Sequence, residues 1–170
     1  MSKIKLTQLE KNWIKYDVGN SAYILLATTI IPILFKSIGE NSLSSADYLA
    51  SWGYAMTIST LVIAVLSPIL GAISDGRGKR KPMFQIFLFL GIAGLVVQPL
   101  TTNWVVFLII FIITKIGFNG SLVFYDSMLP DVTTNERMDE VSSLGYAWGY
   151  IGSCVPFIIS IILATKGGDL

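Results

Sequence analysis

The sequence contains no histidine and only one cysteine among its 170 residues. Zinc sites, histidine-based catalysis and disulfide frameworks therefore have almost no residues from which to form, and we expect no metal, cofactor or catalytic residue. Charged residues make up 14% of the chain, whereas a soluble domain usually carries about 25%. A net charge of +1 provides no basic surface for nucleic acid. These absences argue against an ordinary soluble enzyme and against a nucleic-acid-binding protein.

Apolar residues make up 53% of the sequence and are gathered in long runs. A helix needs about 20 mainly apolar residues to cross a bilayer core of about 30 Å. The runs do not show the alternation that is typical of membrane β-strands. We therefore predict an all-α, polytopic membrane protein with five spanning helices and no linker that divides the chain. The predicted spans cover residues 20–38, 49–73, 83–100, 104–125 and 144–165.

The tail before the first run, residues 1–19, lacks the apolar core and cleavage site of a signal peptide. Thr7 and Glu10 fit the capping box of a helix N-terminus. The apolar residues of the tail are spaced to form one side of a short helix on the membrane surface, and they are Ile4, Leu6, Leu9 and Trp13.

Lysine and arginine predict the orientation of the spans, because cytoplasmic loops of membrane proteins are enriched in both. Nine of them lie in the tail, after the second run, or between the fourth and fifth runs, whereas Lys36 and Lys166 lie on the opposite side. This bias places the N-terminus in the cytoplasm. We expect a multi-pass protein of the cell (plasma) membrane, or of a vacuolar-type membrane if the source is eukaryotic.

One ionisable residue lies deep inside a predicted span. Lys115 follows the start of the fourth run by eleven residues, which corresponds to a depth of roughly 16 Å at about 1.5 Å per residue. A charge at this depth is costly, so Lys115 either serves a cavity or forms a buried ion pair or carbonyl contact. The candidate residues of a substrate cavity are Thr28, Tyr54, Thr57, Lys115, Asn119, Trp148 and Tyr150.

Charged residues near the cytoplasmic ends of the spans form a second candidate group. Asp17 and Asp126 are expected either to pair with basic residues of the loop after the second run or to take part in coupling. Residues 127–141 form either a solvated loop or an amphipathic helix that contacts this basic loop and couples helix movements. The candidate coupling network consists of Asp17, Asp126, Asp131 and Arg137.

Small residues recur at every fourth position in two of the runs. They are Gly117 and Ser121 in the fourth run, and Gly145, Gly149 and Ser153 in the fifth. This spacing allows close approach of membrane helices, so it predicts helix contacts rather than chemistry. The prolines of the first, second and fifth runs predict kinks.

Between the second and third runs the chain reads GAISDGRGKRK, from Gly71 to Lys81. Gly71 suits close helix approach, and Gly78 suits a tight turn. The segment resembles the signature loop of the major facilitator superfamily, Gly-x-x-x-Asp-Arg-x-Gly-Arg-Arg, although Gly76 stands where arginine is usual. The alternative is a plain basic loop. The resemblance implies a clamp between two transporter halves, formed by Gly71, Asp75, Arg77, Gly78, Lys79 and Arg80.

A narrower resemblance covers most of the chain and rests on residues 16–23, 117–120, 123–131, 136–143 and 145–152. Together these segments resemble bacterial relatives of the autophagy-linked vacuolar amino-acid effluxers, a branch of the major facilitators. The resemblance implies a secondary transporter that moves a small metabolite, such as an amino acid, by alternating access. Lys115 has no counterpart in the pattern, so the resemblance implies no role for it. The alternative is a non-transporting scaffold or a half-subunit that needs a partner chain.

The number of spans limits what the chain can do alone. Five spans are one fewer than the six-helix half of a major facilitator, and residues 166–170 fall in the next predicted outer loop. We therefore expect residues 1–170 to form an incomplete N-terminal transmembrane half. Its expected partners are the lipid bilayer, a small-molecule substrate and the missing second half. Alone, it is not expected to transport.

Overall fold

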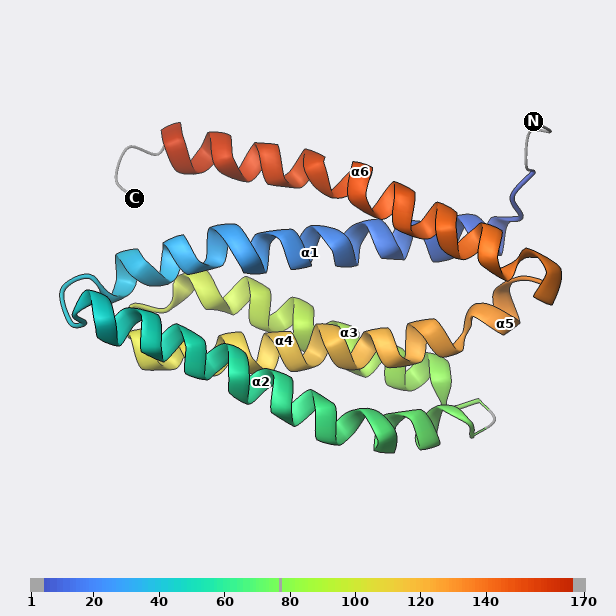
Figure 1. The fold of residues 1–170 in the computed structure, drawn as a ribbon, viewed down its shortest axis with the longest axis horizontal. Helices are drawn as coiled ribbons and strands as arrows, with labels where there is room; N and C mark the ends of the chain where they lie inside the picture. The colour runs from blue at the N-terminus through green and yellow to red at the C-terminus, as the bar shows by residue number, and fades with distance from the viewer. Residues whose placement is uncertain (1–4, 77, 167–170) are drawn as a thin grey trace. The chain divides into compact units, whose positions relative to one another are not determined.

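The computed structural model describes residues 5–76 and 78–166, and in this part the chain forms helices and turns but no strand. The long helices are α1 (Gln8–Gly39), α2 (Ser45–Ser74), α3 (Arg80–Val97), α4 (Trp104–Ser127) and α6 (Met138–Lys166) (Figure 1). The short elements are η1 (Gln98–Leu100), α5 (Leu129–Val132) and η2 (Asn135–Arg137). Five helices in the described residues are long and apolar enough to cross a membrane, which confirms the predicted fold class.

The first helix begins earlier than its apolar run. Helix α1 starts at Gln8 and continues without a break to Gly39, so the separate surface helix expected in the tail is wrong. The predicted capping box starts the helix: the Thr7 backbone N–H donates to Glu10 Oε2 at 2.7 Å, and the Glu10 N–H donates to Thr7 Oγ1 at 3.2 Å. Leu9 and Trp13 therefore belong to α1, and Ile4 lies outside the described residues.

Polar caps also fix the starts of α2 and α4. The Ser44 side chain accepts a hydrogen bond from the Asp47 N–H at 3.2 Å. The Asn103 side chain accepts from the N–H groups of Val105 and Val106 at 2.9 and 3.2 Å. Each cap satisfies N–H groups that have no partner within the helix. Both helices therefore begin within a few residues of the start of their apolar runs.

The connection before α6 is shorter than the predicted loop. Helix α4 ends at Ser127, and α5 and η2 form two short turns before α6 starts at Met138. Pro130 lies within α5, where its missing N–H prevents α4 from continuing as one regular helix. Of the two alternatives for residues 127–141, a solvated loop or an amphipathic helix, the structure forms neither throughout: α5 and η2 are single short turns between α4 and α6.

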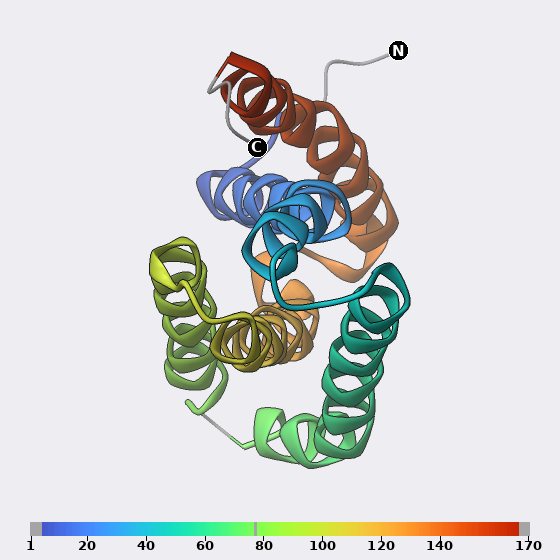
Figure 2. The ribbon, with the colours of Figure 1, turned by 90° about the vertical axis from the view of Figure 1, so that its left-hand side faces the viewer.

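The chain divides into two compact units, each described here by itself. Unit 1 consists of Met1–Ile31 and Leu129–Leu170, and unit 2 consists of Pro32–Met128. In unit 2, helix α4 packs against α3 on one side and against α2 on another (Figure 2). Phe107, Phe111 and Thr114 of α4 are completely covered. Helix α4 is therefore the centre of this unit.

Glycines allow α3 and α4 to pack closely. A Cβ atom at Gly117 would lie 2.5 Å from the backbone nitrogen of Gly91, and one at Gly94 would lie against the Thr114 side chain. A Cβ at Gly120 would likewise collide with the Phe87 ring. Contacts this short leave no room for a side chain, so the two backbones approach as the small-residue pattern predicted.

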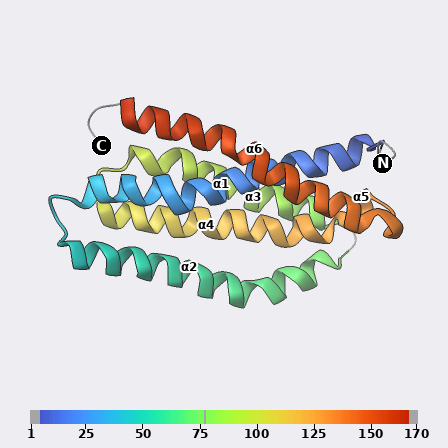
Figure 3. The same ribbon diagram turned by 45° about the horizontal axis from the view of Figure 1, so that its top comes forward.

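Unit 1 is held together by a matching contact between α6 and the first half of α1 (Figure 3). A Cβ atom at Gly145 would lie 2.7 Å from the Trp13 ring, and one at Gly149 would lie 2.7 Å from Ser21 Oγ. The predicted helix contact of the Gly145 and Gly149 pattern is therefore confirmed.

Candidate functional site

Lys115 of α4 reaches across to helix α2. Its Nζ donates to Thr60 Oγ1 at 3.2 Å and lies 3.5 Å from both the carbonyl oxygen and the sulfur of Met56. The Thr60 hydroxyl in turn donates to the Met56 carbonyl oxygen at 2.8 Å. The hydroxyl therefore accepts from the lysine while its own proton is engaged with the backbone. Of the two alternatives considered for Lys115, the carbonyl contact is present in this arrangement.

No acidic partner neutralises this ammonium group in the part of the chain that the structure describes. Its neighbours are a hydroxyl, a carbonyl and a thioether, which are neutral groups. Neutral acceptors solvate a cation without cancelling its charge, so the lysine still attracts an anion. The chemistry that this arrangement supports is the binding of a carboxylate or another anionic group.

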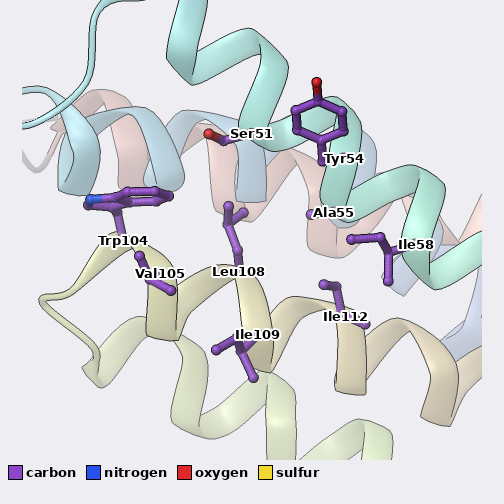
Figure 4. A pocket seen from close by; sticks show the side chains of 9 residues that line it. All are labelled: Ser51, Tyr54, Ala55, Ile58, Trp104, Val105, Leu108, Ile109 and Ile112. Atoms are coloured by element: carbon purple, nitrogen blue, oxygen red, sulfur yellow. The ribbon is translucent and has the colours of Figure 1, made fainter.

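Two open hollows lie along α2 near this lysine. One measures about 270 Å³ and is lined by Met56, Thr57, Thr60 and Leu61, so two of its lining residues also contact Lys115. The other measures about 210 Å³ and lies between α2 and α4; it is lined by Ser51, Tyr54, Ala55, Ile58, Trp104, Val105, Leu108, Ile109 and Ile112 (Figure 4). The Tyr54 hydroxyl points away from α4 in this view, so the second hollow is almost wholly apolar.

Two of the remaining cavity candidates use their side chains within their own helix. The Asn119 amide donates to the Lys115 carbonyl oxygen at 2.8 Å. The Thr28 hydroxyl donates to the carbonyl oxygens of Ile24 and Leu25. Trp148 and Tyr150 of α6 are exposed. Within unit 2 the structure brings together Lys115, Thr60, Met56 and Asn119, whereas Thr28, Trp148 and Tyr150 belong to unit 1.

Sequence reasoning missed Met56 and Thr60 as partners of Lys115. Both lie in the second predicted span, within three residues of the cavity candidate Thr57. Their spacing of four residues places them on one face of a helix. The sequence shows that Met56 and Thr60 share a helix face. It does not show that this face meets Lys115, because that contact depends on how α2 packs against α4.

The basic loop between α2 and α3 contains a tight turn. Gly78 has a φ of +73°, a left-handed conformation that glycine adopts at little cost. Arg80 Nε donates to the carbonyl oxygen of Ser74 at 2.8 Å and so satisfies an acceptor at the end of α2. Asp75 and Lys79 have exposed side chains in this turn, and Arg77 lies outside the described residues.

No helix of the described chain comes close to Gly71, for which a close helix approach is expected. A Cβ atom added at Gly71 would have no neighbour within 4 Å. Leu70 and Ser74 on the same stretch of α2 are buried, but the side of the helix on which a Cβ at Gly71 would lie has no neighbour among the described residues. The tight turn at Gly78, by contrast, agrees with the expectation.

A buried carboxylate that sequence reasoning did not select, Glu10, binds one of the candidate coupling residues. Arg137 Nη1 lies 3.1 Å from Glu10 Oε1, and Thr133 Oγ1 donates to the same oxygen at 2.7 Å. Glu10 is only 1% exposed. Arg137 also pairs locally, with its Nε 3.6 Å from Glu140 Oε2. The capping box identified Glu10 as a helix-start residue, but its long-range partners leave no local signal in the sequence.

The aspartates of the candidate coupling network have different surroundings. Asp17 is half-buried, and its carboxylate lies along the face of α6 formed by Gly145 and Gly149. Asp126 and Asp131 have exposed side chains.

Five apolar helices, with a lysine held by neutral groups between α2 and α4, define a polytopic α-helical membrane protein. Comparison with known proteins gives the family. The model of the family described as "Vacuole effluxer Atg22 like" matches residues 45–169. The chain therefore belongs to the Atg22-like branch of the major facilitator transporters, as the signature loop and the five further segments predicted.

Two curated relatives are similar to the chain. An "Uncharacterized MFS-type transporter YxiO" of Bacillus subtilis (strain 168) is 42% identical over 161 residues, which are 92% of this chain and 38% of the relative. An "Uncharacterized protein" of Aquifex aeolicus (strain VF5) is 29% identical over 149 residues, which are 84% of this chain and 35% of the relative. The chain thus spans less than two fifths of either relative. No solved structure is significantly similar to it.

Proposed function

We propose that this chain forms part of a secondary transporter that moves a small anionic or zwitterionic metabolite, such as an amino acid, by alternating access. Membership of a major facilitator family supports transport across a membrane. The observation that carries the substrate class is Lys115, a cation within a membrane-spanning helix that has only neutral partners among the described residues.

A substrate carboxylate would complete this site. Hydrogen bonds between charged partners are shorter and stronger than those between neutral ones, so a carboxylate is a better partner for the ammonium than Thr60 or Met56. The adjoining hollow of about 270 Å³ gives access to the contact from the α2 side. Transporters of this kind place their substrate near the middle of the membrane. Thr28, Tyr54, Thr57, Asn119, Trp148 and Tyr150 are candidates for the rest of the cavity.

The proposed topology follows from the distribution of basic residues. The protein resides in the cell membrane with its N-terminus in the cytoplasm, because nine of the twelve lysines and arginines lie in residues 1–19, in residues 77–81 or at position 137, which fall on the same side. The loop from Gly71 to Arg80, including Arg77, acts as a clamp against the second transporter half.

Counterflow in proteoliposomes tests the proposal. The whole protein that contains this chain is reconstituted and loaded with amino acids, their uncharged amides, or dicarboxylates, and the exchange of labelled solute is measured. We expect exchange of a carboxylate-bearing solute but not of its amide. Lys115→Met should lower that exchange by about tenfold or more, because a charge-assisted hydrogen bond is lost.

Two control variants complete the design. Lys115→Arg keeps the charge and should retain part of the activity, whereas Lys36→Met removes an exposed lysine from the end of α1 and should leave exchange unchanged. Equal exchange by the Lys115→Met and unmodified proteins would reject Lys115 as the anion site. If no solute exchanges, the alternative of a non-transporting scaffold is favoured instead.

A further inference from the structure

Among the described residues, Arg137 at the end of η2 has two acidic partners, one distant in the sequence and one in the first turn of α6. Its Nη1 lies 3.1 Å from Glu10 of α1, and its Nε lies 3.6 Å from Glu140, one turn further along its own segment. Arg137 is 31% exposed at its side chain, whereas Glu10 is almost completely covered. The guanidinium therefore joins the start of α1 to the turn that precedes α6.

Each partner keeps other hydrogen bonds if this contact breaks. Glu10 retains the N–H of Thr7 at 2.7 Å and the hydroxyl of Thr133 at 2.7 Å. Arg137 retains Glu140. A buried ion pair is usually costly to break because one charge is left without a partner. Here Arg137 keeps an acidic partner and Glu10 keeps two neutral hydrogen-bond donors, so the cost of separation is reduced.

We propose that Arg137 switches between Glu10 and Glu140, so that η2 (Asn135–Arg137) is latched to the start of α1 in one transport state and released in the other, while Thr133 stays bound to Glu10. In the latched state Arg137 bridges both carboxylates, as in this structure. In the released state it pairs with Glu140 alone. In both arrangements Arg137 has an acidic partner and Glu10 has hydrogen-bond donors, which is the property required of an element with two accessible arrangements.

The competition between the two carboxylates makes the latch distinguishable from an ordinary structural contact. Removing the charge of Glu10 should favour release. Removing the charge of Glu140 should have the opposite effect, because Arg137 then has Glu10 as its one remaining acidic partner in this network. A contact that only stabilises the fold would be weakened by both changes.

The experiment measures the latch directly in the whole protein. Spin labels are attached at Leu9 and Asn135, which are exposed residues on the two sides of the contact, and the distance distribution is recorded in liposomes of phosphatidylethanolamine and phosphatidylglycerol. We expect Glu10→Gln and Arg137→Gln to raise the long-distance population about threefold. Glu140→Gln should lower it, and Glu10→Gln combined with Arg137→Gln should equal Arg137→Gln alone.

Equal distributions in all variants, or a shift in one direction for both Glu10→Gln and Glu140→Gln, would overturn the latch. The Glu140→Gln variant keeps the test valid if Glu10→Gln folds poorly, because Glu140 is not buried. The inference rests on the proposed transport function, but the two fail separately. If the protein shows counterflow but the spin-label distances do not change, only the latch is rejected. If the distances shift but no solute shows counterflow, the proposed transport function is rejected, and with it the role of the latch in transport.

Discussion

Gly117 of α4 and Gly91 of α3 bring their two helices into backbone contact. A Cβ atom at Gly117 would lie 2.5 Å from the Gly91 nitrogen, 2.8 Å from the Gly91 Cα and 2.9 Å from the carbonyl oxygen of Phe87. All three atoms belong to the backbone, which cannot turn aside as a flexible side chain can. The face of α4 towards α2 is different, because there the long side chain of Lys115 extends between the two helices. Helix α4 therefore has one face that packs tightly on α3 and another that extends a long side chain to α2.

Gly117→Ala should destabilise the protein. The added methyl group must push α3 and α4 apart, and overpacking of this kind costs about 1–3 kcal/mol. Thermal unfolding of the protein purified in detergent measures the effect. The matched control is Gly53→Ala in α2, where a Cβ would meet nothing within 4 Å; its stability should be unchanged or higher. Equal unfolding temperatures for both variants would contradict the close helix contact.

Thr60→Val should weaken the site of Lys115 while leaving the shape of α2 almost unchanged. The substitution removes the oxygen that accepts from the Lys115 ammonium at 3.2 Å, and a hydrogen bond to a charged group contributes about 1.5–3 kcal/mol. We expect a lower unfolding temperature and weaker binding of a carboxylate solute, measured by isothermal calorimetry. Thr60→Ser keeps the hydroxyl and should behave like the unmodified protein. If the valine and serine variants have the same unfolding temperature and the same affinity for the solute, the hydrogen bond between Lys115 and Thr60 contributes nothing to stability or binding.

The five long apolar helices could be predicted because apolar runs of sufficient length have few alternatives to a helix that can cross a membrane. The start of α1 was missed because residues 8–19 are polar enough to resemble a tail, although the capping box of Thr7 and Glu10 marked it. The partners of Glu10 could not be predicted, since Thr133 lies 123 residues away. Lys115 was selected from its depth alone, but its contacts with Met56 and Thr60 depend on the packing of α2 against α4.

Gly78→Ala should strain the turn between α2 and α3. A φ of +73° places a Cβ atom too close to the neighbouring carbonyl oxygen, at a cost of about 1–2 kcal/mol. Gly78→Asn should cost less, because asparagine tolerates this conformation better than alanine. The unfolding temperatures of the two variants test the order. If alanine is tolerated as well as asparagine, the left-handed turn is not retained in the protein in detergent.

Asn103→Ala should destabilise the start of α4. The Asn103 side chain accepts from the N–H groups of Val105 and Val106, and loss of such a cap costs about 0.5–2 kcal/mol. Asn103→Asp keeps an acceptor at the same position and adds a negative charge next to the positive end of the helix dipole. We therefore expect the aspartate variant to unfold at the same temperature as the unmodified protein or above it, and the alanine variant to unfold below both. An alanine variant as stable as the aspartate variant would show that water replaces this cap without loss.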